Sequence, residues 1–185
     1  QSDEFHQGAY FKAEDGELFF GGINGFNRFY PHEIKDDKQK PSVVLTRFSL
    51  ANQMVEVQKP NQAKTAGFSL PQAIDELQQL TLNYQQSLMS FEFAALNFSS
   101  PMKSQYAYYL QGWDQDWIYT EADNRRATYT NIPPGDYTLR VKASNPDGYW
   151  DEQGKSLKIK ILPPPWKTSW AYLVYALGFA SLTMM

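Results

Sequence analysis

Apolar and polar residues alternate almost without interruption in two stretches of the chain, "DYTLRVKAS" and "SLKIKIL". Successive side chains of a β-strand point to opposite faces of a sheet, so strict alternation is typical of a strand with one buried face. We expect an inward set of Tyr137, Leu139, Val141, Ala143, Leu157, Ile159 and Ile161. We expect an outward set of Thr138, Arg140, Lys142, Ser144, Lys158 and Lys160. The pattern favours a sheet with one covered and one uncovered face.

The same period of two recurs through the middle of the chain. It is found in residues 42–52, 54–58, 80–84, 88–98, 104–112 and 127–132. Residues 59–75 are polar and interrupted by proline, which predicts a loop with a short helical turn. Roughly seven short, evenly spaced strands predict an all-β fold, an Ig-like or fibronectin III-like antiparallel β-sandwich over residues 42–162.

A tyrosine corner is predicted at the start of one of these strands. In "IPPGDYTLRV" a Pro-Gly turn leads directly into Tyr137 and the alternating run. In sandwich domains a tyrosine at this position bonds through its hydroxyl to the backbone a few residues upstream. We expect the same of Tyr137.

The densest aromatic cluster is "YAYYLQGWDQDW", residues 106–117. We interpret it as core followed by a turn. The core positions are Tyr106, Tyr108, Leu110 and Trp117, and the turn positions are Gly112 and Asp114. Gly112 suits a backbone angle that other residues avoid, and Trp117 is expected to begin the next strand. The alternative is a sugar-stacking platform formed by Tyr109, Trp113 and Trp150, which lie off the presumed core face or in loops.

Composition excludes several classes of function. The 185 residues contain no cysteine, so disulfides, thiolate metal sites and cysteine nucleophiles are absent. The net charge is −3 and the basic residues are scattered, which argues against a nucleic-acid partner. His6 and His32 lack metal-ligand spacing, and the acidic residues of 114–123 lack an EF-hand pattern. We expect no metal, no cofactor and no catalytic residue.

Residues 1–34 differ from the rest of the chain. They hold short aromatic runs separated by glycine-rich turns, "DG" at Asp15 and Gly16 and "GGING" at 21–25. Two or three strands this short cannot bury a face alone. A charged linker follows at residues 35–41.

Residues 163–185 begin with Pro163 to Pro165 and continue into a run, 171–182, that is nearly all apolar. The prolines stiffen the chain where the last strand ends. We expect this run to begin a transmembrane helix, with Trp166, Trp170 and Tyr172 at the membrane interface. The alternative is a helix packed on the sandwich. Because the chain starts without methionine and stops within the run, we expect it to be a piece of a longer protein.

Several spaced motifs resemble one family. Residues 106–117 meet the pattern tyrosine, x, tyrosine, x, leucine, x, glycine, x, aspartate, x, x, tryptophan. The stretch "RRATYTNIPPGDYTLRVKASN" also matches the family, and "LMSFEFAALNFSSP" precedes both motifs. This resembles the Y-Y-Y domain that follows the β-propellers of bacterial two-component sensors, over about residues 42–162. "GELFFGGINGFNRFYPHEI" resembles the last propeller repeat of the same sensors, which marks 1–34 as the remnant of a blade.

The resemblance implies a non-catalytic module in the periplasmic part of a bacterial inner-membrane protein. It would couple a ligand-sensing propeller to a transmembrane helix and a histidine kinase or other output. The implied partners are the chain's own propeller and membrane helix, a second copy in a homodimer, and an oligosaccharide bound through the propeller. The alternative from the residues is a carbohydrate-binding module of a secreted or anchored glycosidase.

Overall fold

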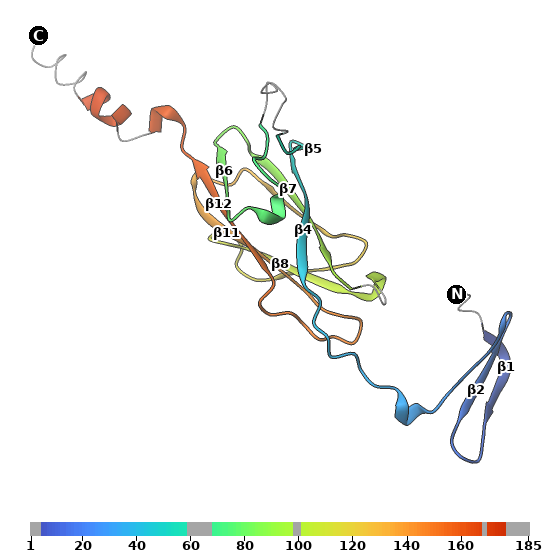
Figure 1. Ribbon diagram of the computed structural model, residues 1–185. Helices are drawn as coiled ribbons and strands as arrows, with labels where there is room; N and C mark the ends of the chain where they lie inside the picture. The colour runs from blue at the N-terminus through green and yellow to red at the C-terminus, as the bar shows by residue number, and fades with distance from the viewer. Residues whose placement is uncertain (1–4, 59–67, 98–100, 168–169, 177–185) are drawn as a thin grey trace, which may run out of the picture. The chain divides into compact units, whose positions relative to one another are not determined.

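The computed structural model describes residues 5–58, 68–97, 101–167 and 170–176 (Figure 1). The chain divides into two compact units, Gln1–Lys38 and Gln39–Met185. Each unit is described by itself below.

The first unit is a three-stranded antiparallel sheet. Its strands are β1 (Phe5–Lys12), β2 (Leu18–Gly22) and β3 (Gly25–Phe29), in that order across the sheet, and the short helix η1 (Pro31–Glu33) follows. The expected turn forms at Asp15 and Gly16, where Gly16 has φ +90°. Asp15 accepts a 2.7 Å hydrogen bond from the Tyr30 hydroxyl, which lowers the pKa of the carboxyl and raises that of the phenol.

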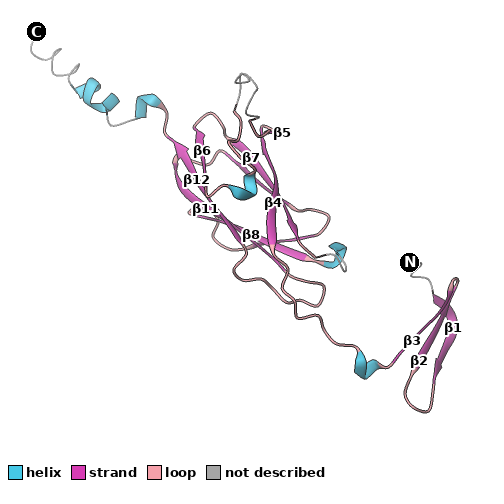
Figure 2. Ribbon diagram, in the orientation of Figure 1, coloured by secondary structure: helices cyan, strands magenta, loops and turns pink. Residues whose placement is uncertain are grey.

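The second unit is a sandwich of two sheets, as Figure 2 shows, which confirms the predicted fold class. The first sheet has the order β10-β7-β4-β5, with bounds Arg126–Thr130, Leu88–Ala95, Val43–Leu50 and Gln53–Met54. The second has the order β6-β12-β11-β8-β9, with bounds Gln79–Asn83, Lys155–Leu162, Gly135–Ala143, Gln105–Gln111 and Ile118–Glu121. Three short helices lie in the connections, η2 (Ile74–Glu76), η3 (Pro101–Lys103) and η4 (Pro165–Lys167).

The core lies between the two sheets and is built from the alternating positions. Large side chains that are almost completely buried include Phe48, Phe91, Phe93, Leu110, Leu139, Leu157 and Ile159. Each comes from a stretch with a period of two, because a strand sends every second side chain into the space between the sheets. Burial of this apolar surface is the main driving force for the fold.

One pairing departs from a purely antiparallel sandwich. β6 and β12 run parallel, with Leu80 opposite Ile159. β12 therefore lies inside its sheet, bonded to β6 on one side and to β11 on the other. Strand order depends on how distant segments meet, and the alternating pattern of a single strand carries no information about its neighbours.

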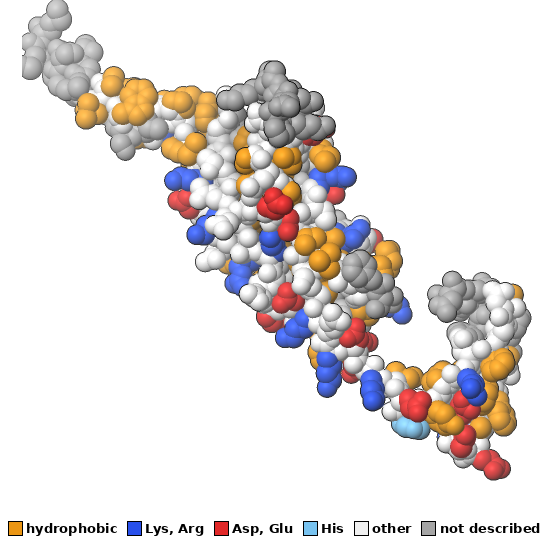
Figure 3. Space-filling model, viewed as in Figure 1, with side chains coloured by type: hydrophobic (Ala, Val, Ile, Leu, Met, Phe, Trp, Pro, Cys, Tyr) orange, Lys and Arg blue, Asp and Glu red, His pale blue; other side chains and the backbone are white. Residues whose placement is uncertain are grey.

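The chain leaves the sandwich through Pro163 to Pro165 and continues to a helical segment at residues 170–176. Trp166, Trp170 and Tyr172 are all more than half exposed, and hydrophobic side chains gather on this segment in Figure 3. The Trp166 ring contacts Tyr84, with 5.2 Å between centroids. No helix within the described ranges is long and apolar enough to span a bilayer, and residues 177–185 of the expected span lie outside those ranges.

Candidate functional site

The tyrosines of the aromatic cluster join the two sheets. Tyr106 is only 1% exposed, and its hydroxyl accepts a 3.1 Å hydrogen bond from the backbone N–H of Ala95 in the opposite sheet. Tyr108 packs edge-on against Tyr129 and contacts Phe93. The side chains that the sequence places on the inward face of β8 therefore both fill the core and bridge it.

Asp114 closes the turn after β8 and reaches the other sheet. Its Oδ2 accepts a 2.7 Å bond from the backbone N–H of Leu110 and another of 2.7 Å from the Tyr129 hydroxyl. The turn itself needs Gly112, which has φ +95°. Burial, reinforced by the nearby Asp114 carboxylate, raises the pKa of Tyr129 and of Tyr108. The phenol of Tyr129 thus remains a donor to Asp114 at neutral pH.

Tyr137 makes the hydrogen bond expected of a corner tyrosine. Its hydroxyl donates to the carbonyl of Pro133 at 2.9 Å. Two glycines lie against its ring: a Cβ added at Gly112 or Gly135 would come within 3.1 or 3.2 Å of the tyrosine side chain. The ring leaves little room for a side chain at either position, which explains both glycines.

The core assignment of Trp117 is wrong. Trp117 is half-buried on the outer face of the five-stranded sheet, just before β9 begins at Ile118. Its ring lies 5.7 Å from Tyr109, and the Lys142 ammonium lies 4.7 Å from its centroid. Cation–π attraction to the ammonium and contact with the lysine stem stabilise the tryptophan there, although the alternating pattern predicts that this face is polar.

Part of this outer face is buried by other side chains, although the sequence pattern predicts that it is exposed to solvent. Lys142 is only 9% exposed, and its ammonium lies between the rings of Trp117 and Trp150, 5.2 Å from the latter. Glu152 completes the cluster with a 2.8 Å ion pair to Lys142. Ser144, the residue that follows β11 and continues its outward positions, is fully buried. The loop between β11 and β12 folds back over the sheet and produces this cover.

The three residues of the alternative sugar platform differ in what they contact. Tyr109 packs on Trp117, whereas Trp150 contacts Lys142 and Tyr119. Trp113 is 47% exposed, in the turn after β8. Side chains of the chain itself occupy ring faces that a sugar would need, so the arrangement stabilises the loop.

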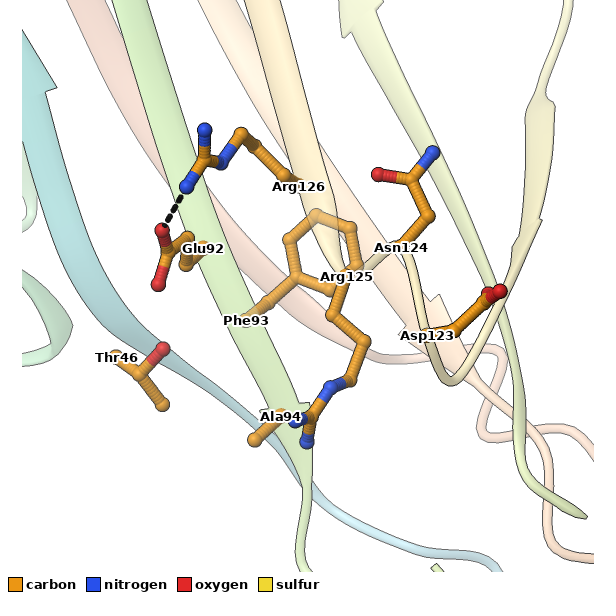
Figure 4. Close-up of a pocket in the computed structure, with 8 residues that line it drawn as sticks. All are labelled: Thr46, Glu92, Phe93, Ala94, Asp123, Asn124, Arg125 and Arg126. Atoms are coloured by element: carbon orange, nitrogen blue, oxygen red, sulfur yellow. Dashed lines mark hydrogen bonds and ion pairs between the residues drawn. The ribbon is translucent and has the colours of Figure 1, made fainter. Parts of the chain in front are cut away.

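A hollow of about 410 Å³ lies on the outer face of the other sheet (Figure 4). Glu92 pairs with Arg126, which also lines the hollow, at 2.6 Å. It also pairs with Arg47 of the neighbouring strand β4 at 3.5 Å. Arg125 and Asp123 are exposed at the rim of the hollow. Such a row of surface charges is solvated and lacks a nucleophile with an adjacent base.

Candidate metal ligands in the described part of the chain do not converge either. Among the described residues, no group of three or more histidine, cysteine, aspartate or glutamate side chains could hold an ion. His32 lies against the Tyr30 ring, and the side chain of His6 lies outside the described part of the chain.

Comparison with known proteins identifies the tyrosine-rich half of the sandwich. The family model described as the Y_Y_Y domain matches residues 97–162. Residues 97–162 carry a Y_Y_Y domain. The match spans β8 to β12, with the cluster of 106–117 and the corner at Tyr137, while β4 to β7 complete the sandwich around the Y_Y_Y match.

Proteins similar to this chain include a histidine kinase and the extracellular domains of two other bacterial proteins. "Histidine kinase P4" of Formosa agariphila is 32% identical over 176 residues, which cover 95% of this chain and 12% of that protein. In solved structures, the extracellular domain of a protein classed as a hybrid two-component system of B. thetaiotaomicron is 28% identical, with a TM-score of 0.62 over 87% of this chain and 20% of that one.

A second extracellular domain, from a protein of the same bacterium classed as a one-component system, is 25% identical, with a TM-score of 0.58 over 89% of this chain and 21% of that one. The chain with its Y_Y_Y domain therefore spans about an eighth of the kinase and about a fifth of each extracellular domain.

Proposed function

We propose that this chain is a non-catalytic, extracytoplasmic module of a bacterial sensor. It couples a ligand-sensing β-propeller, which the sheet of β1–β3 closes, to a membrane segment and a cytoplasmic output such as a histidine kinase. The observation that carries the proposal is the position of β12. The strand that leads out of the sandwich is an interior strand of its sheet.

An interior exit strand moves only with the sandwich. β12 is paired with β11 from Gly135 to Val141 and with β6 from Gln79 to Asn83. Its inward side chains, Leu157, Ile159 and Ile161, are buried in the core. Displacing β12 alone would break both ladders and expose these side chains to water. A rotation of the sandwich is therefore passed to the prolines at 163–165.

The partners proposed for the module follow from this role. They are the propeller before it, the membrane segment after it, and a second copy in a sensor dimer, with an oligosaccharide as the ligand of the propeller. Its location is the periplasmic part of an inner-membrane protein. The similarity to extracellular domains of signalling proteins supports this location.

Inserting four Gly and Ser residues between Leu162 and Pro163 of the complete sensor tests the proposal. The flexible insert should abolish ligand-dependent output, because it disconnects β12 from the segment that follows. The same insert after Asp123, in the exposed turn between β9 and β10, should leave output intact. Normal output from the first variant would refute the relay.

The carbohydrate-binding alternative has weaker support, because ring faces of Tyr109, Trp117 and Trp150 are occupied by other side chains of the chain. Titrating the isolated chain with oligosaccharides, with tryptophan fluorescence as the signal, tests it. Saturable quenching that is lost in Trp150→Ala would favour this alternative over the relay.

A further inference from the structure

The incoming chain is attached to the loop that leads into the exit strand. The carbonyl of Gln39, at the start of the sandwich unit, accepts a 3.1 Å hydrogen bond from Nδ2 of Asn145. Asn145 lies two residues after the last residue of β11 and is 2% exposed. The bond joins residues 106 positions apart in the sequence. It therefore connects the first residue of the unit to the β11–β12 loop.

The side chain of Asn145 uses its two ends for two tasks. Its Oδ1 accepts hydrogen bonds from the backbone N–H of Asp147, at 3.1 Å, and of Tyr149, at 2.8 Å. These bonds hold the turn "NPDG", which Gly148 completes with φ +85°. The oxygen thus shapes the loop, while the nitrogen holds the incoming chain. Aspartate would keep the acceptor and lose the donor.

The loop is in turn fixed to the sheet beneath it. Asp151 donates its backbone N–H to the carbonyl of Ala143 at 2.9 Å, and Ser144 forms a β-bridge with Trp150. The Lys142–Glu152 ion pair adds a third attachment, in which Lys142 lies against the tryptophan rings and Glu152 is exposed. Because these contacts attach the loop to β11 at three points, the loop moves together with β11 and β12.

We infer that Asn145 is a positioning residue that couples the incoming linker to the hairpin of the exit strand. A displacement of the linker at Gln39 is passed through the Asn145 amide to the β11–β12 loop. From there it enters β12, which begins at Lys155 and leads out of the sandwich. The attachment is a property of this chain, whereas its consequence for signalling rests on the proposed function.

The attachment is tested by spin labels in a chain without native cysteine. Labels at Lys40→Cys and Lys158→Cys report the direction of the linker relative to β12. Asn145→Asp should broaden their distance distribution by about twofold, since the hydrogen bond from Asn145 to the Gln39 carbonyl is lost. The native circular dichroism spectrum should remain that of the parent, because the acceptor bonds to Asp147 and Tyr149 persist. The melting temperature should fall, because Asn145→Asp buries a carboxylate against the Gln39 carbonyl.

Two control variants complete the experiment. Asn124→Asp, in the exposed turn between β9 and β10, should leave the distance distribution unchanged. Asn145→Ala loses both sets of bonds and should broaden the distribution and lower the melting temperature together. An unchanged distribution in Asn145→Asp, or equal broadening in Asn124→Asp, would overturn the attachment.

The signalling consequence is measured in the complete sensor carrying Asn145→Asp. Reduced output at normal expression supports the coupling role. Suppose that this variant gives normal output although its distance distribution is broadened, and that the insertion between Leu162 and Pro163 abolishes output. The role of Asn145 is then overturned, and the relay itself stands. If the insertion at that junction also leaves output intact, the relay itself fails.

Discussion

The hydroxyl of Tyr129 donates a 2.7 Å hydrogen bond to the carboxylate of Asp114, and this bond ties β10 of one sheet to the turn after β8 in the other. The same carboxylate oxygen accepts the backbone N–H of Leu110. A partly buried charge is thereby satisfied from both sheets, which is the condition under which burying it is tolerated. The bond fixes how the two sheets lie against each other at this end of the sandwich.

Removing the carboxylate should destabilise the fold more than removing the phenol. Asp114→Ala leaves the Tyr129 hydroxyl and the Leu110 N–H without an acceptor, at a cost of about 2–4 kcal/mol. Tyr129→Phe should cost about 1–3 kcal/mol. Urea unfolding of both variants measures these costs, with the exposed Asp116→Ala as a control near zero. Equal effects of Asp114→Ala and Asp116→Ala would contradict the bridge.

Alkaline pH should weaken the sandwich through Tyr129. Burial raises the pKa of its phenol above the ordinary value of 10.0, so the unfolded chain loses this proton first. The stabilisation is therefore fully present below pH 10 and is lost as the pH rises further. The free energy of unfolding should fall by up to about 1.4 kcal/mol per pH unit from this group. Urea melts above pH 10 should show a shallower fall in Tyr129→Phe, and an identical slope in both proteins would refute the assignment.

Tyr137→Phe should destabilise the sandwich without changing its structure. The variant loses only the hydrogen bond to the Pro133 carbonyl, at a cost of about 0.5–1.5 kcal/mol. The ring that fills the space beside Gly112 and Gly135 remains. Thermal unfolding followed by circular dichroism gives the cost, and native spectra before melting show that the fold persists. A melting curve that coincides with the parent's would argue against the corner bond.

Trp117→Ala should cost less than a fully buried tryptophan would. Loss of half-buried ring area and of the attraction to Lys142 amounts to about 1–3 kcal/mol. Trp113→Ala, in the exposed turn, is the matched control and should cost less than 1 kcal/mol, about the effect of an ordinary surface substitution. Hydrogen exchange of residues 145–153 should rise in the first variant alone. Unchanged exchange there would mean that Trp117 does not hold the loop.

The β1–β3 sheet should promote self-association. Tyr10, Phe11 and Phe26 are each more than 60% exposed on it, and exposed apolar patches and sheet edges favour contact with another chain. Light scattering should therefore detect oligomers of the 185-residue chain. Deleting residues 1–34 should weaken this association and leave the sandwich folded. A monomeric parent, or an oligomer unaffected by the deletion, would contradict this expectation.

Local patterns in the sequence determined much of the sandwich. The inward faces of Phe91, Leu139 and Ile159 follow from alternation, because a strand turns each successive side chain to the other face whatever its neighbours are. The bond of Tyr137 to Pro133 could be predicted for a similar reason, since the two residues are four positions apart in one turn. Both features depend on short stretches of chain.

Contacts between distant segments were decided only by the tertiary structure. The parallel pairing of β6 with β12 and the bond from Asn145 to Gln39 depend on which segments meet. Trp117 shows the physical reason most directly. Its large apolar ring predicts a core position when the local sequence alone is considered. In the structure, Lys142 from another strand and the loop that carries Trp150 bury part of this ring on the outer face. A side chain is buried by whatever folds over it, and that is a property of the assembled sheets.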